Sequence, residues 1–291
     1  MSKIRRVTVL GAGVMGHGIA QIASQAGKFE VTMCARTTVD RGFAMILKSL
    51  EVFEMKRILT KAEKREILGR IHKTSDLQEA VLDADLVIES IPEKLEEKSA
   101  LFKKIDEYIS PEVIVATNTS SLNITTLSSS LSHPERFCGM HFFNPAQLMK
   151  LVEVTKGKKT SDKTIGAIMD VAHKMEKETV LIKRDSPGFI VNRIIIPALN
   201  EAAAICWEGV ADRDDIDKAI KLGLNWPMGP LMLIDYIGVD TVLAIAKNLE
   251  AESSGLLHPS QGLEQLVKAN QLGRKTGKGY YEWSERKNSS S

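Results

Sequence analysis

The spacing of hydrophobic residues changes character near residue 184. Before that point, short apolar runs of strand type alternate with longer stretches in which apolar residues recur at helical spacing. After it, almost every segment has the helical period. Strands that alternate with helices are typical of a doubly wound, mostly parallel sheet. The pattern therefore predicts an α/β domain over residues 1–184 and an all-α domain over residues 185–291.

The elements of the two domains follow from the same pattern. Strands are predicted at residues 5–10, 30–34, 85–91, 112–118, 137–143, 151–157 and 179–183. Helices of the first domain are predicted at residues 14–27, 39–57, 61–68, 94–109 and 162–177. Those of the second domain are predicted at residues 188–208, 212–221, 229–235, 239–251 and 260–270. The polar tail, residues 284–291, is expected to be disordered.

Composition and charge exclude several classes of protein. Of the 291 residues, 43% are hydrophobic and 26% are charged, the balance of a soluble globular protein. The net charge of +2 is far from the strongly basic character of a nucleic-acid-binding domain. The most apolar stretch, residues 194–207, is interrupted by Pro197, Asn200 and Glu201, so we expect no membrane span.

Neither the cysteines nor the histidines form the pattern of a metal or redox site. The six histidines have no zinc-type pairing, and His17, just inside a predicted helix, is expected to be exposed and inert. Widely separated, reduced thiols are typical of a cytoplasmic protein, which is where we expect the chain to act. The cysteines are Cys34, Cys138 and Cys206.

A glycine-rich turn follows the first predicted strand. The segment LGAGVMGHG has Gly11, Gly13 and Gly16 in the spacing G-x-G-x-x-G, ahead of a helix that opens with Val14 and Met15. The first glycine permits a tight turn, the second permits close approach of a pyrophosphate, and the third permits helix–strand packing. Free N–H groups at the helix N-terminus then face the phosphates. The first domain is therefore predicted to be of the Rossmann type and to bind a dinucleotide.

The second predicted strand ends where such proteins read the ribose. A site for NAD(H) has an Asp or Glu there, whereas this chain has Ala35, Arg36 and Thr37. Without the carboxylate, a 2′-phosphate is not repelled, and a guanidinium attracts it. We therefore predict that the site binds NADP(H), with NAD(H) as the alternative. The competing interpretation of Arg36 is a solvated loop residue.

One histidine and one glutamate lie on successive predicted strands. His141 ends the first strand, Glu153 lies inside the second, and a turn at Asn144-Pro145 separates them. A neutral imidazole can take a hydroxyl proton while hydride leaves the same carbon, and a carboxylate on its other nitrogen fixes the tautomer. From the spacing alone, a histidine of the core remains the stronger alternative.

Six ordered motifs carry a resemblance that favours the catalytic interpretation. They are GAGVMGHGIA, NTSSLNIT, HFFNPAQLMKLVEV, DSPGFIVNRIIIPALNEA, GLNWPMGPLMLIDYIG and GRKTGKGYYEW. Together, over about residues 4–283, they resemble the short-chain 3-hydroxyacyl-CoA dehydrogenases, and among them the 3-hydroxybutyryl-CoA dehydrogenases. The resemblance implies a reversible hydride transfer between a nicotinamide cofactor and 3-hydroxybutyryl-CoA or acetoacetyl-CoA. It also implies a homodimer formed through the helical domain, which binds substrate.

The resemblance assigns roles to residues at matching positions. It implies that His141 is the acid–base catalyst, oriented by Glu153, and that Ser120 and Asn192 position the substrate. Contacts to the nicotinamide half of the cofactor are implied for Glu93, Lys98, Ser120 and Asn144, and a contact from the tail for Lys275. Contacts to coenzyme A are implied for Ser49 and Lys56, which begin a basic cluster with Arg57, Lys61, Lys64 and Arg65. A solvated helical face is the alternative for that cluster.

Ala35 is the one departure from the family pattern. Most relatives have an Asp at this position, so the usual preference of the family for NAD is not carried over. Three other functions remain as alternatives: an NAD-dependent 3-hydroxyacyl-CoA dehydrogenase of broader chain length, a non-catalytic relative, and a different β-hydroxyacid dehydrogenase. The last group uses an active-site lysine, which the His–Glu pair disfavours.

Overall fold

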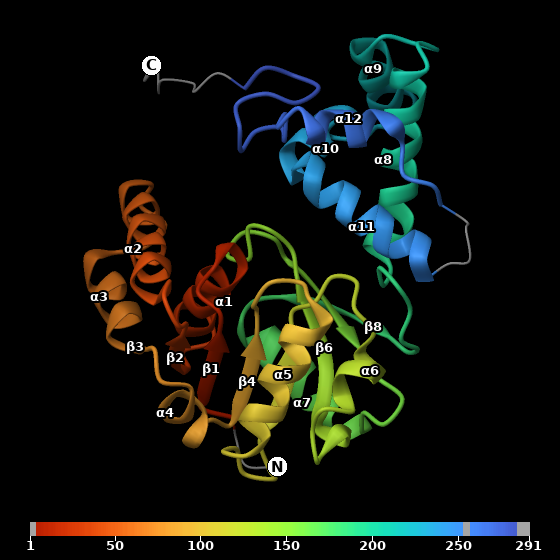
Figure 1. Cartoon of the computed structure of the whole chain (residues 1–291). Coiled ribbons are helices and arrows are strands. Elements are labelled where there is room, and N and C mark those ends of the chain that lie inside the picture. Colours follow the sequence, from red (N-terminus) through yellow and green to blue (C-terminus); the bar gives the residue numbers. More distant parts are fainter. Residues whose placement is uncertain (1–3, 253–256, 284–291) are drawn as a thin grey trace. The chain divides into compact units, whose positions relative to one another are not determined.

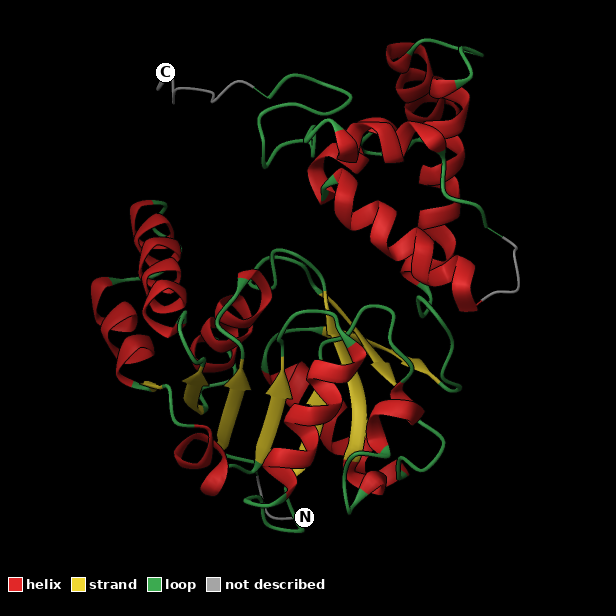
Figure 2. Cartoon of the chain, in the orientation of Figure 1, coloured by secondary structure: helices red, strands yellow, loops and turns green. Residues whose placement is uncertain are grey.

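The chain folds into two compact units, Met1–Ser186 and Pro187–Ser291. A computed structural model describes residues 4–252 and 257–283, so the tail expected to be disordered lies outside the described residues. The first unit combines strands and helices, and the second consists of helices joined by loops (Figures 1 and 2).

The first unit is built on an eight-stranded sheet among the described residues, in the order β3-β2-β1-β4-β5-β6-β7-β8. Strands β1 to β6 are parallel, whereas β7 runs antiparallel to β6 and parallel to β8. The strand order reverses between β1 and β4, and ligands of such sheets bind at the carboxyl ends of the strands near that reversal. The strands are β1 (Arg6–Leu10), β2 (Glu30–Cys34), β3 (Ile71–Thr74), β4 (Leu86–Glu89), β5 (Ile114–Thr117), β6 (Phe137–Phe142), β7 (Leu151–Thr155) and β8 (Glu178–Ile182).

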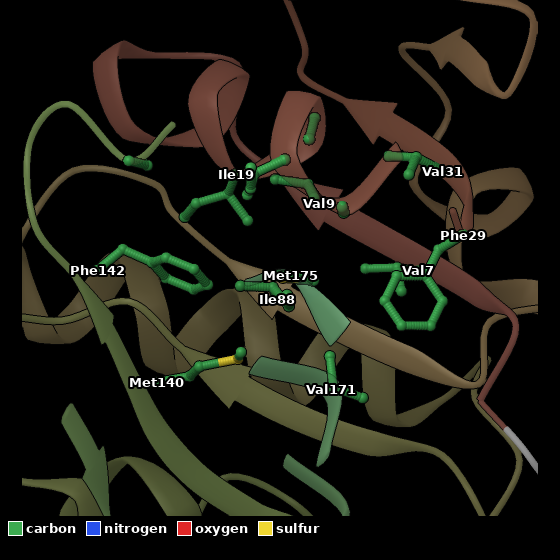
Figure 3. Packing of buried hydrophobic residues seen from close by; sticks show 14 of the residues in the cluster. Val7, Val9, Ile19, Phe29, Val31, Ile88, Met140, Phe142, Val171 and Met175 are labelled. Atoms are coloured by element: carbon green, nitrogen blue, oxygen red, sulfur yellow. The ribbon is translucent and has the colours of Figure 1, made fainter. Parts of the chain in front are cut away.

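Helices cover both faces of this sheet. One apolar cluster joins β1 to helices α1, α2, α3 and α7, with Val7 and Val9 facing Ile19 and Val171 (Figure 3). On the opposite face the Thr8 hydroxyl donates to the Ala80 carbonyl of α4 at 2.5 Å, as expected for the alternation of side chains along a strand. The helices are α1 (Val14–Gln25), α2 (Val39–Met55), α3 (Lys61–Gly69), α4 (Leu77–Leu82), α5 (Leu95–Asp106), α6 (Ile124–Ser128) and α7 (Asp162–Lys174).

In the second unit, shorter helices pack around α8. The buried side chains of α8, α10, α11 and α12 form one apolar core. No helix in the described ranges is both long enough and apolar enough to cross a membrane. The helices are α8 (Val191–Trp207), α9 (Arg213–Leu224), α10 (Pro230–Ile237), α11 (Val239–Glu252) and α12 (Gln261–Lys268).

Two buried aspartates connect this unit internally. Asp217 accepts from the backbone N–H groups of Leu231 and Met232 at 2.7 and 3.0 Å, at the start of α10, and from the Tyr281 hydroxyl at 3.0 Å. Asp235 is fully buried and accepts from the Tyr281 N–H at 2.8 Å and the Trp283 indole at 2.9 Å. The loop after α12 is therefore held against α10 by hydrogen bonds to the Asp235 carboxylate.

The observed elements confirm the predicted fold class. The predicted strands and long helices are present with ends that differ by a few residues. The segment between α3 and β4, for which the pattern predicted nothing, contains β3 and α4. Strand β3 reads IHKT and only Ile71 is buried, so it lacks the apolar run by which the other strands were recognised.

Candidate active site

The glycine-rich loop has the geometry of a dinucleotide cradle. Gly11 has a φ of +107°, and a Cβ there would collide with the Ser90 carbonyl at the end of β4. A Cβ on Gly16 would collide with the Gly11 carbonyl, whereas a Cβ on Gly13 would meet nothing within 4 Å. Gly13 is also the N-cap of α1 and has no side chain to cap the first turn. The loop thus leaves open space before Val14 and Met15, as a pyrophosphate requires.

His17 corrects one prediction. Its side chain was expected to be exposed, but the residue is only 7% exposed. Its Nδ1–H donates to the Gly13 carbonyl at 2.8 Å. The reason is that α1 is packed on nearly all sides, so that every residue from Gly16 to Ser24 is buried. His17 therefore supports the cradle from within.

The segment after β2 lies next to this cradle. The Gly11 N–H donates to the Cys34 carbonyl at 2.8 Å, so the two loops are joined. Ala35 is half-buried, and Arg36 and Thr37 are exposed. The pKa of Glu97, in the first turn of α5, is lowered chiefly by its hydrogen bond from Lys94 and to a smaller extent by Arg36.

His141 and Glu153 are directly paired. They are register partners in the antiparallel ladder of β6 and β7, and His141 Nδ1 lies 2.8 Å from Glu153 Oε2. Their side chains are 8% and 1% exposed. A carboxylate only accepts, so Nδ1 carries the hydrogen of this bond, and in a neutral imidazole Nε2 then has the free lone pair. The Phe143 ring packs against the imidazole with 4.6 Å between ring centroids.

The loop after β5 carries Ser120 to the same edge of the sheet. Asn118 precedes it, and its Oδ1 accepts from the Phe142 N–H at 2.8 Å, beside His141. Glu93 Oε1 then accepts from the N–H groups of Ser120 and Ser121 at 2.8 and 3.1 Å. The sheet therefore brings the predicted Ser120 to the strand ends that hold the histidine.

Glu93 and Lys98 belong to a buried cluster that also contains Glu89. The Lys98 ammonium, 1% exposed, donates to Glu89 Oε1 at 2.6 Å and to the Ile91 carbonyl at 3.2 Å. It lies 3.3 Å from Glu93 Oε2. Burial, the largest effect, raises the pKa of Glu89. Burial also acts to raise the pKa of Glu93, but Lys98 and the donors of the Ser120 loop outweigh it and lower that pKa.

Three further predicted residues lie in the β6–β7 connection or on α2. Asn144 is exposed and precedes a cis peptide bond to Pro145. Ser49 is half-buried on α2, and its hydroxyl accepts from the Gln147 amide of that connection at 3.5 Å. Lys56, the C-cap of α2, is exposed. In the basic cluster nearby, Lys64 pairs with Glu54 at 2.7 Å.

The remaining predicted residues belong to the second unit. Asn192 is the second residue of α8 and is half-buried. Lys275 lies in the loop after α12, and its ammonium pairs with Asp240 of α11. Each of these residues is positioned by its own unit.

Sequence reasoning missed several residues that support the site. Glu89 lies in a run that was interpreted only as an apolar strand, although a carboxylate in such a run is itself a signal. Lys177 is 5% exposed, and its ammonium donates to the Ala146 and Met149 carbonyls at 2.7 and 2.8 Å. Lys177 therefore stabilises the connection between β6 and β7 through two hydrogen bonds to its backbone. No motif marked it.

Two other features lie outside this site. A cavity of about 520 Å³ opens among residues at the opposite, amino ends of the strands, including Arg6, Asp83, Asp85 and Arg136. Within residues 4–252 and 257–283, no cluster of His, Cys, Asp and Glu could hold a metal ion. In the first unit, the predicted site residues lie instead toward the carboxyl ends of β1, β4, β5 and β6, and Glu153 of β7 pairs with His141 there.

Known proteins resemble both units. The family model described as "3-hydroxyacyl-CoA dehydrogenase, NAD binding domain" matches residues 6–186, and that of the C-terminal domain of the same family matches residues 188–283. A probable 3-hydroxybutyryl-CoA dehydrogenase of Deinococcus radiodurans is 47% identical, covering 94% of this chain and 99% of that protein. The mitochondrial hydroxyacyl-coenzyme A dehydrogenase of Sus scrofa is 40% identical, covering 96% and 91%.

The solved structures include a similar fold. The crystal structure of (S)-3-hydroxybutyryl-CoA dehydrogenase from Ralstonia eutropha has a TM-score of 0.91 and 40% sequence identity. The match covers 97% of this chain and all of that one.

Proposed function

The chain belongs to the 3-hydroxyacyl-CoA dehydrogenase family and is an oxidoreductase acting on a CH–OH group, and from this we propose that it interconverts 3-hydroxybutyryl-CoA and acetoacetyl-CoA. One observation carries the proposal: the buried contact of 2.8 Å between His141 Nδ1 and Glu153 Oε2. A histidine oriented by a carboxylate is suited to moving the proton of a hydroxyl group. The names of the similar proteins agree with this substrate.

The proton is moved by His141. In oxidation, Nε2 accepts the proton of the 3-hydroxyl group, and in reduction it returns that proton to the 3-oxygen. Glu153 keeps Nδ1 protonated and stabilises the imidazolium that forms in oxidation. When bound, the nicotinamide accepts or supplies the hydride. Ser120 and Asn192 hold the 3-oxygen and the thioester region of the substrate.

The remaining residues bind the two large ligands. Gly11, Gly13 and Gly16 form the cradle for the pyrophosphate, and the open space next to Gly13 supports this role. We propose that coenzyme A contacts α2 at Ser49 and Lys56. The nicotinamide half of the cofactor is held by Glu93, Lys98, Asn144 and Lys275.

The activity is tested directly by absorbance at 340 nm. Purified protein mixed with acetoacetyl-CoA and a reduced nicotinamide dinucleotide is expected to lose that absorbance in proportion to enzyme concentration. Acetoacetate without coenzyme A serves as the control and should react far more slowly. Protein that is folded and inactive with both NADPH and NADH would overturn the proposal.

We further propose that NADP(H) is the preferred cofactor. Ala35 offers no carboxylate to a ribose, and the exposed Arg36 offers a guanidinium to a 2′-phosphate. The Arg36→Ala variant should lower kcat/KM for NADPH about tenfold and leave the value for NADH almost unchanged, as for the loss of one charge-assisted contact. Arg41→Ala, which removes another exposed arginine at the start of α2, is the matched control. A wild-type preference for NADH would refute the proposal.

A broader chain-length range is the second candidate. The relative from Sus scrofa is named for hydroxyacyl-CoA in general, which favours it. A series of 3-ketoacyl-CoA substrates of increasing length separates the two. A kcat/KM that falls sharply beyond four carbons supports the butyryl substrate, and a constant or rising value supports the broader enzyme.

We also propose a cytoplasmic homodimer joined through the helical unit. That unit exposes large apolar side chains that a partner would cover, among them Ile194 at 69%, Val210 at 70% and Leu222 at 76%. Analytical ultracentrifugation should give twice the chain mass of 32.1 kDa. Leu222→Glu should shift the protein toward the monomer if the interface includes α9.

A further inference from the structure

Glu89 stands out as a buried acid that the proposed mechanism does not use. It is the last residue of β4, is wholly inaccessible, and pairs in register with Thr117 at the end of β5. An ionised carboxylate in such a position is strongly destabilising unless charged and hydrogen-bonding partners compensate it. Its retention at a strand end beside the glycine-rich cradle therefore calls for a physical reason.

The contacts of Glu89 lead outward to the site. Oε2 accepts from the Thr117 hydroxyl at 2.6 Å, and Oε1 accepts from the Ile91 N–H at 2.6 Å. Oε1 also accepts from Lys98 at 2.6 Å, and the same ammonium lies 3.3 Å from Glu93 Oε2. Glu89 is thus the inner end of a chain of three charges, Glu89–Lys98–Glu93.

The outer end of this chain holds the Ser120 loop. Glu93 uses Oε1 for the Thr119 hydroxyl at 2.5 Å and for the Ser120 N–H at 2.8 Å, which leaves Oε2 for Lys98. The ammonium of Lys98 has three N–H donors, and its three acceptors are Glu89, Glu93 and the Ile91 carbonyl. Lys98 therefore works as a fixed bridge between two carboxylates.

We propose that Glu89 is a positioning residue for cofactor binding, acting through Lys98 to hold Glu93 and the Ser120 loop in their working geometry. Glu89 binds the ammonium more closely than Glu93 does, at 2.6 Å against 3.3 Å, so it determines where the positive charge lies. Without the charge of Glu89, Lys98 moves toward Glu93 and draws Oε2 inward. The donors of the Ser120 loop must follow. This inference rests on the proposed function, since it assumes that Glu93 contributes to cofactor binding.

Glu89→Gln is the first variant, because it removes the charge and keeps the size. We expect the Kd of NADPH, measured by fluorescence titration, to rise about fivefold to tenfold, as for coupled groups in one network. The KM for the cofactor should rise by a similar factor, and kcat should change less. Loss of folded protein alone would lower kcat and leave both Kd and KM unchanged. Glu107→Gln, at the exposed C-cap of α5, is the matched control and should resemble wild type.

A double variant tests the route through Lys98. Lys98→Met alone leaves two facing carboxylates without their cation, and should weaken cofactor binding at least as much as Glu89→Gln. Adding Glu89→Gln to Lys98→Met should then be neutral or partly restore binding, because it removes one of the two uncompensated charges. Losses that multiply in the double variant would overturn the proposal, as would a Glu89→Gln protein with the wild-type Kd. A wild-type protein that binds no dinucleotide would instead contradict the proposed function.

Discussion

Buried acids have different partners in the two units. In the first unit, Glu153 accepts from the imidazole of His141 at 2.8 Å, and Glu89 accepts from the ammonium of Lys98 at 2.6 Å. In the second unit, Asp217 and Asp235 accept only from backbone N–H groups and aromatic side chains in the contacts described.

The partner, rather than burial, distinguishes a group suited to chemistry. A backbone N–H or an indole keeps its hydrogen under all ordinary conditions and can only hold a carboxylate in place. An imidazole can pass a proton to a substrate, and an ammonium carries a charge that can shift. Substituting an acid that is held by backbone N–H groups or aromatic side chains should therefore lower stability. Substituting an acid that is paired with an imidazole or an ammonium should change the kinetics.

The largest expected effect is that of His141→Gln. It removes the only imidazole of the pair, and kcat should fall about 1000-fold, within the usual contribution of a general acid–base catalyst. Steady-state kinetics with acetoacetyl-CoA measures the loss. The Kd for NADPH and the thermal midpoint should remain close to wild type. A variant that keeps a tenth of the activity would show that another group moves the proton.

Glu153→Gln should have the next largest effect. An amide facing Nδ1 can donate to it, which favours the tautomer that lacks the lone pair on Nε2. We expect kcat to fall about 100-fold, with little change in the KM of the substrate. Glu178→Gln, an exposed residue at the start of the neighbouring β8, is the control. Equal losses in both variants would mean that the change acts through the sheet.

Asp217→Asn should instead lower stability and leave catalysis nearly unchanged. It weakens the cap of α10 and the bond to Tyr281, and should lower the free energy of unfolding by about 2 kcal/mol, as for lost hydrogen bonds to a charged acceptor. Denaturation in urea measures this loss, and kcat per folded molecule should stay within about twofold of wild type. Asp215→Asn, exposed in the first turn of α9, should have much less effect. A large loss of kcat at full stability would break the comparison.

The smallest effect is expected for Lys177→Met. This variant tests whether the unit in which a buried charge lies, or the kind of partner it has, decides the outcome. Lys177 lies in the first unit, but its partners are the fixed carbonyls of Ala146 and Met149. It should therefore behave like Asp217, with a loss of about 1 kcal/mol in unfolding free energy near pH 7 and little change in kcat.

The pH dependence of that loss has a defined sign. Burial lowers the pKa of Lys177, so the native state binds this proton less tightly than the unfolded chain does. Stability from this residue then increases as pH rises from the folded pKa toward the unfolded value of about 10.4. The difference between wild type and Lys177→Met should be larger at pH 9.5 than at pH 7. The opposite trend would contradict the assignment.

Most of the fold was predictable because it rests on local patterns. Period and length identified the long helices and the apolar strands, and the glycine spacing identified the cradle. Strand β3 was missed because its place depends on pairing with β2, from Val31↔Ile71 onward, and not on its own composition. His17 was misjudged because the neighbours that bury α1 come from distant parts of the chain.

The candidate site was predictable only in part. His141 and Glu153 were found because successive strands bring them together and the motif around them is recognisable. Glu89 lies within an apolar run and was therefore overlooked. Its pairing with a lysine of the next helix depends on how the strand and the helix pack in three dimensions, which the sequence pattern does not show. The role of Lys177 depends on two carbonyl groups, which no side-chain pattern encodes.

The hairpin of β6 and β7 has a consequence for how the site forms. The acid and its histidine are only twelve positions apart, so closing the connection between them costs little chain entropy. Their alignment depends on ladder hydrogen bonds between adjacent strands, not on contacts brought from afar. The acid–base couple can therefore form early in folding, within one hairpin and before distant parts of the chain are in place.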